Sequence, residues 1–87
     1  MKDVVIYTTE SCPYCRQAER FLTQHEVPFT AIDVTGDDDM RIKLVELSGG
    51  RRTVPQIFIG GEPIGGYTDM VALHAKNELM PKLTGTR

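Results

Sequence analysis

The only two cysteines of this 87-residue chain lie three positions apart, where a predicted strand gives way to a predicted helix. An apolar run at 4–8 precedes Cys12, and a helical pattern begins at Pro13. Proline suits the first position of a helix, because the N–H group that it lacks would have no partner there. It also favours an extended backbone at the preceding residue, which is the conformation of a helix N-cap. We therefore expect Cys12 to cap the first helix.

A cysteine at a helix N-cap is well placed for thiol chemistry. The free N–H groups of the first turn and the helix dipole stabilise a thiolate relative to a thiol. Arg16 can add to this effect, whereas Glu10 opposes it. Cys15 shares a helix face with Cys12, so a small adjustment of the first turn would allow a disulfide between them. Because Cys12 is nearer the helix end, we predict that it is the nucleophile and that Cys15 resolves mixed disulfides.

Two other interpretations of the cysteine pair have less support. Buried structural thiols are disfavoured by the polar residues Glu10 and Ser11 beside them. A zinc site needs four ligands. His25 is predicted at the far end of the helix and His74 in another helix, so the ligand count falls short. A Cys-x-x-Cys pair within a βαβ unit of an intracellular chain is typical of a redox motif. We therefore expect no bound metal.

The composition excludes several classes of function. The net charge is −2 and the basic residues are scattered, which gives little support to nucleic-acid binding. No apolar run approaches the ~20 residues that span a bilayer, and the N-terminal sequence lacks the apolar region of a signal peptide. We expect a cytoplasmic monomer without nucleic-acid or membrane partners. In such a reducing compartment a close cysteine pair is more often catalytic or metal-binding than structural.

Hydrophobic periodicity predicts the element order β-α-β-α-β-β-α. Strands are predicted at 4–8, 29–34, 54–59 and around 63–64, and helices at 13–24, at about 37–47 and from Thr68 onwards. The first βαβ unit should hold parallel strands with a right-handed crossover, and the glycine pair 60–61 should connect an antiparallel hairpin. The predicted fold class is α/β, a mixed four-stranded sheet flanked by three helices. The residues after Pro81 are expected to fray.

Each predicted helix carries an apolar stripe that should face the core. The expected core residues are Ala18, Phe21 and Leu22 in the first helix, Met40, Leu44 and Leu47 in the second, and Val71, Ala72, Leu73 and Leu79 in the third. One modest core of this kind agrees with a single domain that covers residues 1–87.

Three segments together resemble the small dithiol glutaredoxins over essentially the whole chain. They are Cys12-Pro13-Tyr14-Cys15, Thr53-Val54-Pro55 and Gly65-Gly66-Tyr67-Thr68-Asp69. The resemblance implies a thioredoxin-like fold and a glutathione-dependent thiol–disulfide oxidoreductase, with glutathione as the reducing co-substrate. It implies that Cys12 attacks glutathione mixed disulfides or protein disulfides, that Cys15 resolves the mixed disulfide, and that glutathione restores the dithiol. The implied partners are glutathione and disulfide-bearing or glutathionylated proteins.

The resemblance also implies a groove for glutathione. Pro55 is expected to be a cis-proline that faces the cysteines, so that the backbone of Val54 can pair with a peptide as an added strand would. Free N–H groups where the third helix starts can hold a carboxylate, and Asp69 can face an ammonium. The expected glutathione-binding residues are Tyr14, Arg41, Thr53, Val54, Pro55, Gly66, Tyr67, Thr68 and Asp69.

The chain departs from the glutaredoxin pattern in two places. Thr9 stands where these proteins often carry a lysine, so the cation for the glycine carboxylate of glutathione must come from elsewhere. Arg41 is our candidate, with Arg51 or Arg52 next. The segment 49–52, before Thr53, is one residue longer than is usual in glutaredoxins. The position in those proteins that corresponds to Arg41 is therefore left open.

Two other functions stay open at this point. A redoxin of the same fold could draw electrons from thioredoxin reductase, although the segment 65–69 and Tyr14 argue against this. Alternatively, two protomers could each supply Cys12, together with two glutathiones, to a [2Fe–2S] cluster. Pro13 stiffens the loop and disfavours that arrangement.

Overall fold

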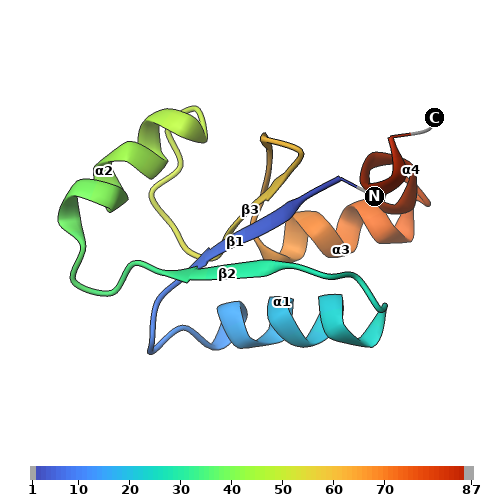
Figure 1. Ribbon diagram of the computed structural model, residues 1–87, viewed down its shortest axis with the longest axis horizontal. Coiled ribbons are helices and arrows are strands. Elements are labelled where there is room, and N and C mark those ends of the chain that lie inside the picture. Colours follow the sequence, from blue (N-terminus) through green and yellow to red (C-terminus); the bar gives the residue numbers. More distant parts are fainter. Residues whose placement is uncertain (1, 86–87) are drawn as a thin grey trace.

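A computed structural model describes residues 2–85 and shows a mixed four-stranded sheet in the order β2-β1-β3-β4 (Figure 1). The strands are β1 (Val4–Thr8), β2 (Thr30–Asp33), β3 (Gln56–Ile59) and β4 (Glu62–Gly65). β1 pairs in parallel with β2 and antiparallel with β3, and β3 and β4 form an antiparallel hairpin. The predicted mixed sheet and the parallel first unit are therefore confirmed. The third strand begins at Gln56, so the prediction that Pro55 lies inside it is wrong.

Helices cover both faces of this sheet. α1 (Pro13–Gln24) has the predicted bounds, and α2 (Asp38–Leu47), α3 (Tyr67–Ala75) and α4 (Leu79–Thr84) follow it. The main core lies between one face of the sheet and the helices α1, α3 and α4, with Ile6, Leu22 and Met70 among its buried members. A smaller cluster of Val34, Leu44 and Phe58 packs α2 against the opposite face. Within residues 2–85, no helix is both long and apolar enough to cross a membrane.

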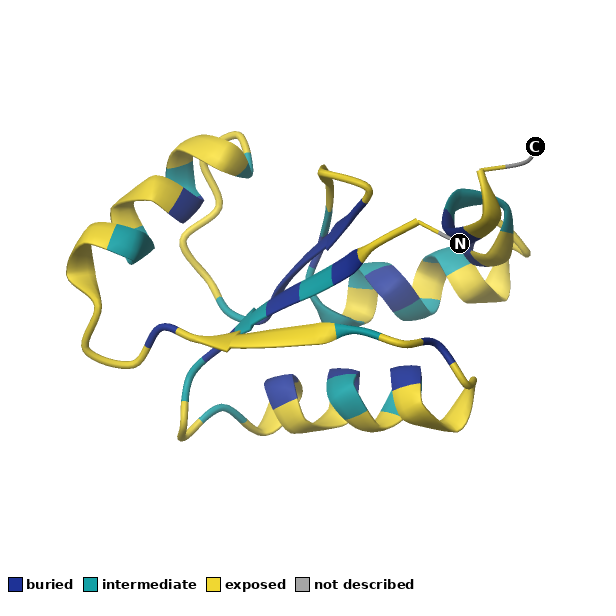
Figure 2. Ribbon diagram, viewed as in Figure 1, coloured by how far each residue is buried: buried dark blue, intermediate teal, exposed yellow. Residues whose placement is uncertain are grey.

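α2 buries less of its surface than its sequence suggests. Leu44 is buried and Met40 is half-buried, as expected, but Leu47 is 47% exposed. Figure 2 shows α2 mostly exposed, and the four residues of β2 are exposed as well. The helix contacts the sheet through the small cluster around Leu44, so Leu47, at the end of the helix, lies outside that contact. The prediction that Leu47 is a core residue is therefore wrong.

The residues of α3 that face the core also differ from those expected from the sequence. Met70 is fully buried, Val71 and Leu73 are half-buried, and Ala72 is exposed. The N-cap is Gly66, two residues before Thr68, which was the expected start. An apolar run of this length has no clear 3.6-residue period, so the sequence could not fix which side of the helix faces inward.

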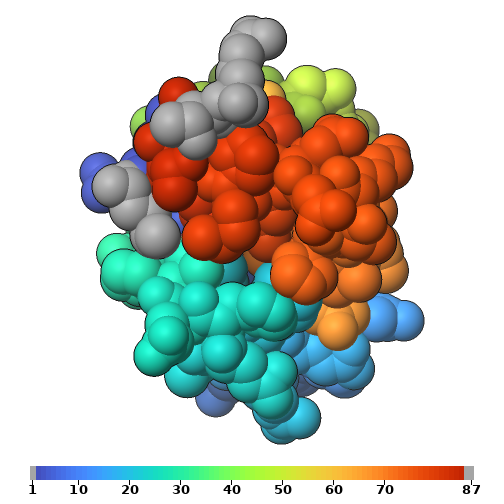
Figure 3. Space-filling model, turned by 90° about the vertical axis from the view of Figure 1, so that its right-hand side faces the viewer, coloured from blue at the N-terminus to red at the C-terminus, as the bar shows by residue number. Residues whose placement is uncertain are grey.

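Residues 79–84 form a fourth helix although the residues after Pro81 were expected to fray, and the part of that expectation that falls on residues 86–87 lies outside the described residues. Leu79 and Leu83, four residues apart on α4, are both buried in the main core. Pro81 lies in the first turn of α4, where backbone N–H groups have no helical partner, so it does not interrupt the helix. Figure 3 shows α4, in red, packed against α3, in orange. The predicted count of three helices is corrected to four within residues 2–85.

Replacing Leu83 with alanine tests whether α4 belongs to the core. Leu83 is fully buried, so Leu83→Ala should lower the free energy of unfolding in urea by about 2–5 kcal/mol. Met80→Ala is the matched control on the same helix, because Met80 is 46% exposed, and it should cost less than about 1 kcal/mol. Equal and small effects of both changes would show that α4 does not contribute to the folded core.

Candidate active site

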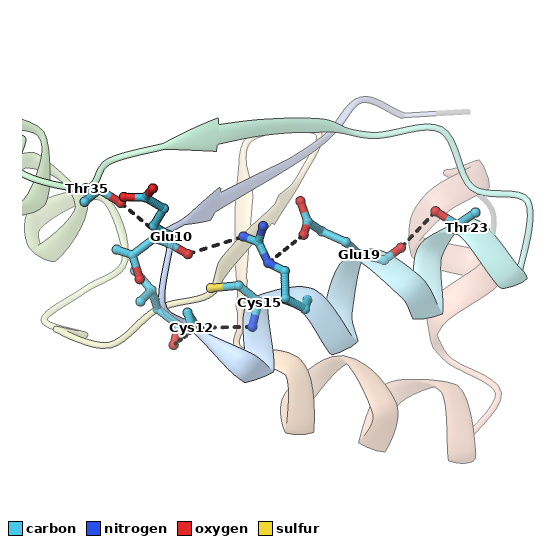
Figure 4. A network of polar contacts seen from close by, with 9 residues as sticks. Glu10, Cys12, Cys15, Glu19, Thr23 and Thr35 are labelled. Atoms are coloured by element: carbon cyan, nitrogen blue, oxygen red, sulfur yellow. Dashed lines mark hydrogen bonds and ion pairs between the residues drawn. The ribbon is translucent and has the colours of Figure 1, made fainter.

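Cys12 caps α1 as the sequence predicts. Its backbone is extended, with φ −110° and ψ 103°, and Pro13 occupies the first turn. The backbone N–H of Cys15 donates a hydrogen bond to the Cys12 sulfur at 3.1 Å (Figure 4). The sulfur therefore replaces the oxygen that a serine or aspartate would supply at an N-cap. This contact and the positive end of the helix dipole favour negative charge on the Cys12 sulfur.

The two cysteines have different surroundings. Both are free thiols, but Cys12 is half-buried whereas Cys15 is 0% exposed. Burial and, after it, the hydrogen bond with Cys12 raise the pKa of the Cys15 thiol to about 12, although a backbone hydrogen bond with Thr9 and the charge of Arg16 act in the opposite direction. The Cys12 thiol donates to the carbonyl oxygen of Val54, with 3.6 Å between sulfur and oxygen. Cys12 is thus the thiol that faces the segment before β3.

The loop between β1 and α1 is held by contacts from two elements. The Arg16 guanidinium donates to the Thr9 carbonyl at 3.3 Å and pairs with Glu19 at 3.1 Å (Figure 4). The backbone N–H of Glu10 donates to the Thr35 hydroxyl at 2.8 Å. These contacts attach the loop that carries Cys12 to the first turns of α1 and to the segment after β2.

A groove of about 340 Å³ is lined by Val54, whose carbonyl oxygen the Cys12 thiol contacts. The residues that line it are Tyr14, Arg51, Thr53, Val54, Pro55, Gly66, Tyr67, Thr68 and Asp69. The structure thus brings together all the predicted glutathione-binding residues except Arg41, although they come from three separate parts of the chain. The Val54–Pro55 peptide bond is cis, as the resemblance implied. The rings of Tyr14 and Tyr67 lie 6.2 Å apart between their centroids, at one side of the groove.

The structure places Arg41 and Arg51, two of the three arginine candidates, differently. The Arg41 guanidinium donates to the Arg52 carbonyl at 3.3 Å, and Arg41 does not line the groove. Arg51 does line it, but its guanidinium pairs with Asp69 at 2.7 Å. The role of Arg41 as the partner of a glycine carboxylate stays a prediction. Sequence reasoning named Arg51 only after Arg41 and did not predict its ion pair with Asp69, because no local pattern links Arg51 to a helix that begins sixteen residues later.

Asp69 is the acidic residue among those that line the groove. Its Oδ2 atom accepts hydrogen bonds from the Gly66 N–H at 2.8 Å and from Arg51. The Gly66 N–H first, and then Arg51, hold the pKa of this carboxyl below its usual value. Asp69 therefore stabilises the start of α3 and presents a negative charge to the groove at the same time.

The two histidines lie apart from this groove. The ring centroids of His25 and His74 are 4.7 Å apart, and Phe21 packs against both rings. Among residues 2–85, no group of three or more His, Cys, Asp or Glu side chains is arranged to hold a metal ion.

The chain is similar to known proteins of the glutaredoxin family. The glutaredoxin family model matches residues 4–64. The chain is 43% identical to glutaredoxin 3 of Escherichia coli (strain K12) over 83 residues, which are 95% of this chain and 99% of that protein. The crystal structure of a buckwheat glutaredoxin–glutathione complex has a TM-score of 0.88 at 29% identity, covering 97% of this chain and 78% of that one. The solution structure of a Brucella melitensis glutaredoxin has a TM-score of 0.83 at 40% identity, covering 100% and 95%. These likenesses confirm the thioredoxin-like fold.

Cys12 and Cys15 should differ in their reaction with iodoacetamide. Only a thiolate is alkylated efficiently, so the folded, reduced protein should be modified at Cys12 alone, whereas the urea-unfolded protein should be modified at both residues. Because the pKa of Cys15 is raised to about 12, its protection should persist above the ordinary thiol range and fade only as the pH approaches that value. Peptide mass spectrometry measures both sites. Comparable modification of Cys15 in the folded protein at neutral pH would contradict the assigned roles.

Proposed function

Because the chain belongs to the glutaredoxin family of thiol–disulfide oxidoreductases, we propose that it takes electrons from glutathione and that Cys12 is its nucleophile. One observation carries this proposal most directly. The Cys12 sulfur lies at the start of a helix, within 3.6 Å of the Val54 carbonyl, and Val54 lines the groove. A disulfide bound there would meet the sulfur that the helix start favours as a thiolate.

The charges and backbone groups of the groove suit a γ-glutamyl peptide. The backbone of Val54 offers groups that can pair with the peptide bonds of glutathione. At the other end of the groove, the start of α3 favours a carboxylate, and Asp69 favours an ammonium. The γ-glutamyl end of glutathione carries both groups on one carbon atom. Glutathione is present in the buckwheat relative, which supports the same assignment here.

The reaction on a glutathione mixed disulfide needs Cys12 alone. The Cys12 thiolate attacks the glutathione sulfur, an S–S bond forms between them, and the other thiol leaves and takes up a proton. The thiolate of a second glutathione then attacks the mixed disulfide. This step releases oxidised glutathione and restores the Cys12 thiolate, so each turnover consumes one free glutathione, which pairs with the glutathione that the substrate carried.

Reduction of a protein disulfide requires Cys15 as well. The first attack joins Cys12 to the protein substrate, and the sulfur of Cys15 then displaces the reduced protein and forms a Cys12–Cys15 disulfide. Two glutathiones reduce this disulfide in turn. Burial and the raised pKa of Cys15 limit the amount of its thiolate, so the geometry favours the route through Cys12 alone. We further propose that the protein acts as a monomer in a reducing compartment such as the cytoplasm, where both thiols stay reduced.

Serine substitutions separate the two routes. Cys12→Ser should abolish reduction of both a glutathionylated peptide and a protein disulfide, because Cys15, the other cysteine of the chain, is fully buried. Cys15→Ser should keep most of the activity on the glutathionylated peptide and lose the activity on the protein disulfide. Turnover is followed through NADPH consumption by glutathione reductase. Activity that survives Cys12→Ser, or equal loss of both activities in Cys15→Ser, would show that the roles are misassigned.

The electron donor is tested with the unmodified protein. Glutathione with glutathione reductase should support turnover of a glutathionylated small disulfide, whereas thioredoxin reductase with NADPH should not. The opposite result would replace glutathione with thioredoxin reductase as the donor and would leave the function of the dithiol intact.

A further inference from the structure

The C-terminal ends of α1 and α3 bring the two histidines of the chain into contact. His25 is the C-cap of α1, and His74 lies in the last turn of α3. Figure 1 shows the two helices running in the same direction along one face of the sheet. The ring centroids of the two histidines are therefore only 4.7 Å apart, although the residues are 49 positions apart in the sequence. The sequence placed them on different helices, and the packed fold makes them a pair.

Phe21 contacts both imidazole rings. Its ring stacks on that of His25, with 4.1 Å between the centroids, and packs edge-on against that of His74, with 5.4 Å between the centroids. Phe21 in turn packs against the main core. The core thus helps to set both rings in place, which lowers the entropy cost of ordering them around a shared ligand.

One nitrogen of His25 is engaged in the way that is typical of metal-binding histidines. Its Nδ1 atom lies 2.9 Å from the Phe21 carbonyl oxygen. Because a carbonyl oxygen can only accept, Nδ1 carries the hydrogen, and the neutral ring has its lone pair at Nε2. Metal-ligating histidines usually donate their other ring N–H to a carbonyl or a carboxylate in this manner. The Nε2 atom of His25 is therefore the one suited to bind a metal ion.

The separation of the two rings suits one shared ion. A zinc ion lies about 2.0–2.1 Å from an imidazole nitrogen, and therefore about 3.2 Å from the centre of that ring. Two imidazoles on one ion, at an angle between a right angle and the tetrahedral angle, then have centroids about 4.5–5.3 Å apart. The observed 4.7 Å lies within this range. The ring planes are inclined by 70°, and because both histidines are exposed, each ring can turn to direct a nitrogen at the ion.

The two helix ends favour positive charge at this place. The last carbonyl groups of a helix have no helical partner, and they form the negative end of the helix dipole. Both α1 and α3 end at these histidines, so two negative helix ends lie beside the same pair of rings. Both dipoles would stabilise a cation bound between the rings.

We propose that His25 and His74 form a site for a divalent transition-metal ion such as Zn²⁺ or Ni²⁺, with water molecules as the other ligands. Imidazole nitrogen suits these ions, whereas Mg²⁺ prefers oxygen ligands. Within residues 2–85 no third His, Cys, Asp or Glu side chain joins the pair, so the ion is exchangeable rather than a permanent part of the fold. It would link the C-terminal ends of the two helices whose N-terminal ends lie at the groove. This inference is independent of the proposed function.

The test measures Zn²⁺ binding by isothermal titration calorimetry in a Cys12→Ser background, because a thiolate would compete for the ion. Cys15 is 0% exposed and stays in place. In this background, His25→Gln and His74→Gln each remove one imidazole. His74→Phe also removes the imidazole but keeps an aromatic ring beside Phe21, which separates loss of a ligand from loss of packing.

The Cys12→Ser protein should bind one Zn²⁺ per chain, should bind Ni²⁺ as well, and should not bind Mg²⁺ under the same conditions. Each of the three histidine variants should lose Zn²⁺ affinity by at least on the order of 10-fold. Lys76→Gln, a change at the exposed C-cap of α3, is the control and should not weaken binding. Zn²⁺ should also raise the urea midpoint of unfolding of the Cys12→Ser protein and leave that of the His74→Phe variant unchanged.

Three results would overturn the inference. Absence of Zn²⁺ binding to the Cys12→Ser protein would make the two rings an aromatic contact only. Unchanged affinity in His74→Phe would place the ion elsewhere on the chain. A loss in His25→Gln alone would show a single ligand instead of a shared ion.

Discussion

The hydrogen bond from the Cys15 N–H to the Cys12 sulfur is the contact on which the active site depends. A helix start leaves N–H groups without partners, and a capping side chain typically contributes ~1 kcal/mol by accepting from one of them. In this chain the Cys12 sulfur is the acceptor, so the hydrogen bond that caps α1 also favours the thiolate form that a nucleophile needs. Pro13 supports both effects, because it sets the backbone of Cys12 and places Cys15 one turn along the helix.

The order of the strands in the sheet brings the segments of the groove together. β1 and β3 are neighbours in the sheet, so the end of β1 and the residues before β3 meet at one edge. The loop after β1 carries Cys12, and the segment before β3 carries Thr53, Val54 and Pro55. β4 then returns the chain to that edge, where α3 starts at Gly66. Three segments far apart in sequence are thereby brought together around one sulfur.

Local patterns predicted some of these features and could not predict others. The start of α1 followed from Pro13 and an apolar stripe, and both its bounds and the cap by Cys12 agree with the structure. Leu47 and Ala72 were placed in the core by their hydrophobicity, yet Leu47 lies beyond the contact of α2 with the sheet and Ala72 lies on the exposed side of α3. α4 was missed because it has six residues and its burial comes from tertiary packing. The position of Arg51 beside Asp69 is likewise tertiary, since it needs α2, β3 and α3 in their final arrangement.

The most direct test of the account is the NMR spectrum of Cys15→Ser with one glutathione attached to Cys12. If the groove is the glutathione site, the backbone amide signals that change should be those of Val54 and of residues 66–69, together with those around Cys12. The signals of His25 and His74, which lie apart from the groove, should stay unchanged and serve as the internal reference. A single adduct on Cys12 that leaves the signals of Val54 and 66–69 unchanged would contradict the account, because glutathione would then be attached without being bound.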